Sequence, residues 1–163
     1  MATKAETFAT QGLTEGYTGT NSAKPMVLGE IPFNSAQIHD GNSKYFDLWL
    51  RGVKIGVGTE VILTDEDNLG RQYSGGIVAS EKQLKMLGIT AKQIIEMLKV
   101  FINNLTTKTR FFQECPPIVD GKWTYKYEIT YRDEDTGVVN TKESMLYGET
   151  LVFVHNFQLT PIK

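Results

Sequence analysis

The stretch KWTYKYEITYR, residues 122–132, alternates more strictly than any other part of the chain. Its aromatic and aliphatic residues occupy every second position, so an extended backbone puts them all on one side. A helix would spread the same residues around its whole surface. The stretch therefore predicts a strand with one packed face, formed by Trp123, Tyr125, Tyr127, Ile129 and Tyr131. We expect the rest of the fold to pack on this row.

The length and composition of the chain indicate one globular domain. Its 163 residues, 40% of them hydrophobic and 22% charged, are enough to bury a core without cross-links. The single cysteine, Cys115, excludes an intramolecular disulfide. The formal charge of −2 gives no general attraction to nucleic acid or to an anionic membrane. No stretch resembles a signal peptide or a membrane span, so we expect a protein made in a cytosol, with no membrane partner.

Residues 1–43 differ from the rest of the chain. They are rich in Thr, Gly, Ser and Ala, and their few apolar residues follow neither a helical nor a strand period for long. Pro25 and Pro32 favour extended backbone before them. We interpret residues 1–43 as an extended N-terminal arm and residues 44–163 as a single β-rich domain. The candidate anchors of this assembly arm on a neighbouring copy are Leu13, Tyr17, Met26, Leu28, Ile31 and Phe33.

The body of the chain alternates strand patterns with one helical region. Ser80 with Gln83, and Thr90 with Gln93, form two capping boxes that predict the starts of two helices. The second helix carries one apolar stripe, made by Ile94, Ile95, Leu98, Phe101, Ile102 and Leu105. Three strands are expected before the helices and two or three after them, at residues 44–51, 60–64, 71–79, 122–132, 138–146 and 150–160.

This order predicts a mainly β protein of the α+β class. We expect a small barrel or sandwich of five to six antiparallel strands, with one helical segment between the third and fourth strands. Two architectures share this order: the five-stranded OB barrel, and a small β-sandwich or barrel that docks into rings or shells of identical copies. The pattern of residues leaves both open.

The sequence contains no recognisable catalytic or metal-binding signature. Nucleophile, phosphate-loop and dinucleotide motifs are absent, and neither His39 nor His155 has a Cys or His at ligand spacing. His155 alternates with Val152 and Val154, which favours a structural role for it. The acidic turns at residues 65–70 and 133–137 are explained by turn chemistry. The sequence therefore predicts no enzyme, no metal site and no cofactor.

Two non-enzymatic functions remain. The first is a structural or assembly protein, a component of a virus or phage particle, whose arm contacts copies of itself or other particle proteins. The alternative is single-stranded nucleic-acid binding by an OB-like barrel. If the Trp123 row faces outward, it is a stacking platform that supports this alternative. We favour the interpretation in which the row is the core side of the strand. The residues of the alternative are Tyr45, Trp49, Arg51, Arg71, Tyr73, Lys126 and Arg132.

Overall fold

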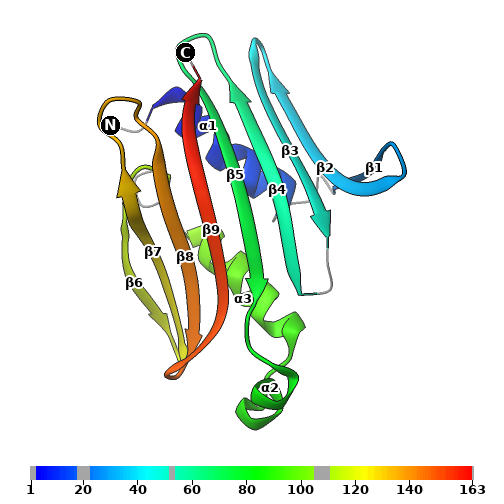
Figure 1. Cartoon of the computed structure of the whole chain (residues 1–163), viewed down its shortest axis with the longest axis vertical. Helices are drawn as coiled ribbons and strands as arrows, with labels where there is room; N and C mark the ends of the chain where they lie inside the picture. Colours follow the sequence, from blue (N-terminus) through cyan, green and yellow to red (C-terminus); the bar gives the residue numbers. More distant parts are fainter. Residues whose placement is uncertain (1–2, 18–22, 52–53, 105–110, 163) are drawn as a thin grey trace.

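The centre of the molecule is one antiparallel sheet of nine strands (Figure 1). The structure is a computed structural model that describes residues 3–17, 23–51, 54–104 and 111–162. The strand order across the sheet is β1-β2-β3-β4-β5-β9-β8-β7-β6. The strands are β1 Lys24–Leu28, β2 Ile31–Asp40, β3 Ser43–Arg51, β4 Ile55–Leu63, β5 Asn68–Ile77, β6 Cys115–Asp120, β7 Trp123–Arg132, β8 Val139–Tyr147 and β9 Thr150–Ile162.

The helices in the described part of the chain are α1 Lys4–Gly12, α2 Glu81–Leu87 and α3 Ala91–Asn104, and a π-helical turn, Leu13–Tyr17, follows α1. Figure 1 shows α1 and α3 behind the sheet, on the same face, while α2 lies beyond the end of β5. The face turned toward the viewer carries no helix of the described residues. One face of the sheet is therefore packed and the other is bare.

The packed face confirms the expected role of the alternating row on β7. Tyr125 and Tyr127 have no exposed surface, and the ring of Phe101 on α3 stacks on Tyr125 with 5.3 Å between centroids. The row ends at a bulge between Ile129 and Tyr131, beyond which Tyr131 is 53% exposed. The row is therefore core and not a stacking platform.

The helical region forms as the sequence predicts. The Ser80 hydroxyl accepts a hydrogen bond from the Gln83 backbone at 3.2 Å, and Thr90 and Gln93 form the same contact at 3.2 Å. These caps satisfy backbone donors that have no partner within the first turn of a helix. The stripe of α3 buries Ile94, Leu98, Phe101 and Ile102. Leu105, the last predicted member of the stripe, lies outside the described residues.

The expected fold, a small barrel or sandwich of five to six strands with one helical segment, is wrong. The described chain forms a single open sheet of nine strands with three α-helices. The two-residue period of a strand identifies its buried face, but it does not specify which strand pairs with it. Here β9 pairs with β5 in the middle of the sheet, and β1 and β6 remain as its two edges.

The extended arm expected for residues 1–43 is also wrong as a conformation. Phe8 and Ala9 of α1, and Leu13 after it, are buried in the core. The helix packs so closely on β3 that a side chain at Gly12 would collide with the ring of Tyr45. Further along, β2 pairs with β3 across residues 34–49. Glycine at position 12 and the apolar face of α1 therefore bring this segment into the same core as the rest of the chain.

Candidate functional site

The bare face of the sheet divides into an apolar half and a polar half. The pairing registers place Phe46, Leu48 and Leu50 of β3 opposite Val61, Thr59 and Val57 of β4, on the side away from the helices. On the same side, the β1–β2 hairpin contributes four more apolar side chains. We call this half the apolar face, and its residues are Met26, Leu28, Ile31, Phe33, Phe46, Leu48, Leu50, Ile55, Val57, Val61 and Leu63.

The β1–β2 hairpin forms the outer end of the apolar face. Its register pairs Met26 with Phe33 and Leu28 with Ile31, so all four side chains point to one side. Leu28 is 49% exposed and Ile31 is 51% exposed. Figure 1 shows the hairpin bending away from the plane of the neighbouring strands. The hairpin therefore presents apolar side chains that the described part of the chain does not cover.

The six candidate anchors of the arm do not all lie in one place. Met26, Leu28, Ile31 and Phe33 are gathered on the hairpin, whereas Leu13 is only 6% exposed and belongs to the core. The side chain of the sixth residue, Tyr17, lies outside the described part of the structure.

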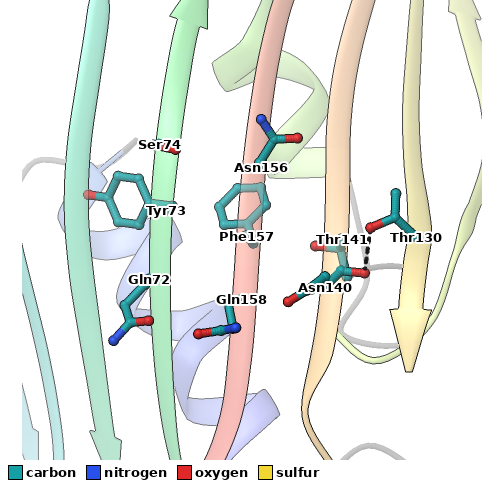
Figure 2. A pocket seen from close by; sticks show the side chains of 9 residues that line it. All are labelled: Gln72, Tyr73, Ser74, Thr130, Asn140, Thr141, Asn156, Phe157 and Gln158. Atoms are coloured by element: carbon teal, nitrogen blue, oxygen red, sulfur yellow. Dashed lines mark hydrogen bonds between the residues drawn. The ribbon is translucent and has the colours of Figure 1, made fainter. Parts of the chain in front are cut away.

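The polar half of the bare face contains a shallow hollow of about 500 Å³ over β5, β9, β8 and the end of β7. Figure 2 shows the carboxamide side chains that line it. The registers align Gln72 of β5, Gln158 of β9 and Asn140 of β8 in one row, and place Ser74 beside Asn156 in the next row. We call this hollow the amide groove.

A second polar group lies on the opposite, packed face, and we call it the buried polar cluster: Tyr45, Asp47, Glu60, Arg71 and Tyr73. The Arg71 guanidinium forms a two-point ion pair with Glu60, one contact through Nε and one at 2.8 Å from Nη2 to Oε1. Tyr45 donates to Glu60 at 2.9 Å, and Tyr73 donates to Asp47 at 2.9 Å.

Aromatic rings enclose the cation of the cluster. The Arg71 guanidinium carbon lies 4.6 Å from the centroid of the Phe111 ring and 4.7 Å from that of Phe157. Such contacts stabilise a desolvated guanidinium. Arg71 and Glu60 are each 1% exposed.

Burial and charge shift the pKa values of the cluster. Desolvation, followed by repulsion from Glu60, raises the pKa of Asp47 well above 3.8. Desolvation also raises the pKa of Tyr45 and of Tyr73, so both phenols remain protonated and act as donors. The cluster holds two carboxyl groups near one cation, without surface for a substrate to reach. It is therefore a buried network that fixes the positions of β3, β4 and β5.

A similar contact lies further along the packed face. Tyr125 donates to the Glu143 carboxylate at 2.6 Å, and His155 Nδ1 lies 3.4 Å from the other oxygen of that carboxylate. His155 also packs edge-on against Phe153 at 4.6 Å. The structural role predicted for His155 agrees with this setting.

The residues of the nucleic-acid alternative are separated by the sheet. Tyr45 and Arg71 are buried in the cluster, Tyr73 joins them, and Trp49 packs against the same core. Lys126 lies on the opposite face, paired with Ser144. Arg132 is exposed and donates to the Phe112 carbonyl at 2.7 Å, and the side chain of Arg51 lies outside the described part. The structure does not bring the six described side chains together.

The sequence interpretation missed the amide groove and the buried polar cluster. Both could have been recognised from the residues at alternate positions of the strands. Gln72-x-Ser74 and Asn156-x-Gln158 put polar groups on one side of two central strands. Asp47 lies between Tyr45 and Trp49 at alternate positions of one strand, so all three side chains share one side, which predicts a carboxylate among buried aromatics.

Comparisons with protein-family models, with curated proteins and with solved structures found no match for this chain. Within residues 3–17, 23–51, 54–104 and 111–162, no group of three or more His, Cys, Asp or Glu side chains is arranged to hold a metal ion. No helix among these same residues is long and apolar enough to cross a membrane.

Proposed function

We propose that this chain is a non-enzymatic structural protein that assembles with copies of itself through its apolar face. The observation that supports the proposal is that apolar side chains of β1, β2, β3 and β4 share the side that no described helix covers, with Ser35 and Gln37 of β2 as polar positions among them. A sheet with one apolar face normally buries it against a second layer. Contiguous apolar patches on soluble proteins commonly mark interaction sites.

The partner proposed here is a second copy. Two such sheets stack face to face at a spacing of about 10 Å, as the layers of a β-sandwich do. Contact through the same patch on both copies is self-complementary and closes as a dimer. The hairpin, which belongs to the segment expected to make assembly contacts, extends the patch beyond the body of the sheet. That this protein is a component of a virus or phage particle remains a prediction from the sequence.

The test is the mass of the full chain in solution, measured by sedimentation equilibrium over a range of concentrations. The unmodified protein is expected to be a dimer or larger. The double variant Leu28→Lys/Ile31→Lys is expected to be a monomer with an unchanged circular dichroism spectrum, because both side chains are already about half exposed.

The matched control is Val119→Lys/Leu151→Lys, which adds the same charges at exposed apolar positions outside the apolar face. This control is expected to retain the mass of the unmodified protein. A monomeric unmodified protein at all concentrations, or a Leu28→Lys/Ile31→Lys variant that assembles normally, would overturn the proposal.

A further inference from the structure

The amide groove gathers four carboxamide side chains on the bare face of the central strands. β5, β9 and β8 lie in the interior of the strand order, where β-branched and aromatic residues are favoured and Asn is disfavoured. The bare face nevertheless carries Gln72, Gln158, Asn140 and Asn156 there, next to Ser74 and Thr130. Because the solvated face of an antiparallel sheet normally carries polar side chains, these positions are set apart by their gathering around one hollow and not by their polarity.

The side chains of the groove have free hydrogen-bonding capacity. Among the described residues, the side chains of Gln72, Ser74, Asn156 and Gln158 form no hydrogen bond with the protein, and all four residues are exposed. Thr130 donates to the backbone carbonyl of Asn140 at 3.1 Å, which links β7 to the row. Each carboxamide offers an NH₂ donor and a carbonyl acceptor. Gln72 and Gln158 therefore present two donor and acceptor pairs one strand spacing apart, about 4.8 Å. The third carbonyl of the row, Asn140 Oδ1, is buried and has no hydrogen-bond partner among the described residues.

The charge of the groove restricts the class of ligand. No Lys, Arg, His, Asp or Glu is among the residues that line it, and one cation, Lys142, lies beside it as the β8 register partner of Asn156. A phosphate-rich chain would need cations at this position. Stacking of bases would need exposed rings, but Tyr73 and Phe157 belong to the alternation that faces the helices, and the Tyr73 hydroxyl is bound to Asp47. The groove therefore fits an uncharged ligand with many hydrogen-bonding groups.

We propose that the amide groove binds a neutral oligosaccharide. A sugar hydroxyl both donates and accepts, so adjacent hydroxyls match the paired donor and acceptor of each carboxamide. The exposed carboxamides of Gln72 and Gln158, with Asn156 in the next row, provide contacts for successive groups along an extended sugar chain. The groove is shallow and open, so binding is weak, with a dissociation constant on the order of 1 mM.

The test follows the side-chain amide signals of the ¹⁵N-labelled full chain by NMR during titration with cellotriose, maltotriose and chitotriose. At least one of these sugars is expected to shift the signals of Gln72, Gln158, Asn140 and Asn156 in a saturable manner. The double variant Gln72→Ala/Gln158→Ala is expected to weaken this binding at least tenfold while its backbone spectrum keeps its dispersion. The matched control is Gln37→Ala, an exposed glutamine of β2 on the same bare face.

The proposal is overturned if none of the three sugars shifts the groove signals at 50 mM, or if the shifts persist unchanged in Gln72→Ala/Gln158→Ala. It is also overturned if the uncharged peptide N-acetyl-trialanine amide shifts the groove signals while the sugars do not. Failure here leaves the proposed self-assembly intact, since assembly is measured by mass and involves the other half of the bare face.

Discussion

At the scale of single residues, the most informative group is the buried polar cluster. Glu60 and Asp47 lie on neighbouring strands as direct register partners, with Arg71 opposite Glu60 on the next strand. One buried cation therefore faces two carboxyl groups. Breaking a buried ion pair leaves an uncompensated charge, which costs far more than the loss of an exposed pair. The network favours one register of β3, β4 and β5, because any shift in register would separate these partners.

The first prediction concerns Asp47 and pH. Its pKa is raised in the folded protein, so the folded state retains a proton that the unfolded chain releases near pH 3.8. The contribution of this group to stability is complete below that pH and is lost as pH rises through the raised pKa. Asp47→Asn removes the titration, so the variant should gain stability relative to the unmodified protein by up to about 1.4 kcal/mol per pH unit in that window. Urea unfolding at half-unit steps from pH 4 to pH 8 measures the difference.

The control for this experiment is Asp65→Asn. Lys4 hydrogen-bonds to the Asp65 carboxylate and lowers its pKa below 3.8, so its effect on stability should not vary with pH between pH 5 and pH 8. A flat difference for Asp47→Asn over the whole range would show that its carboxyl group does not titrate differently in the folded and unfolded states.

At the scale of secondary-structure elements, helix α1 makes the N-terminal segment part of the folded body. Thr3 and Glu6 form a capping box, with the Thr3 backbone donating to Glu6 at 2.7 Å and the Glu6 backbone donating to Thr3 at 3.2 Å. Asp67 also accepts from the Ala5 backbone at 2.9 Å, which ties the start of the helix to the β4–β5 turn. The segment therefore contributes to folding, and removal of residues 1–40 would open the core.

The second prediction follows from that packing. Phe8→Ala should lower the free energy of unfolding by about 3–5 kcal/mol, because Phe8 is 6% exposed and its loss leaves a cavity under the sheet. Thr7→Ala, at the exposed neighbouring position, should change it by no more than about 0.5 kcal/mol. Chemical denaturation of both variants measures the two values. Equal effects of the two substitutions would mean that α1 does not pack on the sheet in solution.

The sequence predicted the elements better than their arrangement. The local period predicted β3, β4, β5, β7, β8 and β9, both capping boxes of the helical region and the buried side of the β7 row, because each depends on neighbours along the chain. It did not predict β6, which contains Pro116 and Pro117. The α1 capping box, Thr3-x-x-Glu6, is present in the sequence but was missed, and small residues such as Ala5 and Ala9 give α1 only a weak apolar stripe. The open sheet was not predictable, since the pairing of β5 with β9 joins residues far apart in sequence.

The same limit applies to the two halves of the bare face. The alternation of Phe46, Leu48 and Leu50 identifies an apolar side of β3, but this side resembles a core side until the positions of the helices are known. The amide groove needs three strands in register before its row exists. Single-strand patterns therefore reveal the components of these surfaces without revealing the surfaces.

At the scale of the whole molecule, the β5–β9 pairing joins the first five strands to the last four. These two strands pair along their length, from Asn68 with Ile162 to Ile77 with Phe153. Phe157 of β9 and Phe111 both lie against the guanidinium of Arg71 on β5, so side-chain contacts in the core also join the two groups of strands. The two groups of strands therefore share one core and should unfold together.

The third prediction uses the two tryptophans, because Trp49 on β3 and Trp123 on β7 lie on opposite sides of the β5–β9 pairing. In Trp123→Phe the fluorescence reports only from Trp49, and in Trp49→Phe only from Trp123. In each variant, the urea midpoint from fluorescence should agree within about 0.2 M with the midpoint from circular dichroism. A variant whose fluorescence changes well before its circular dichroism would show that the two sides unfold separately.

The position of β9 has a consequence for synthesis on the ribosome. β5 is complete at Ile77, but the strand that pairs with its open edge begins only at Thr150. At translation rates of about 5–20 residues per second, residues 78–149 take about 4–14 s to make. During that interval the emerging chain carries an unpaired central strand edge, which readily pairs with other chains. On a polysome, neighbouring nascent copies offer the same edge, so slower translation of residues 78–149 should increase misassembly between them.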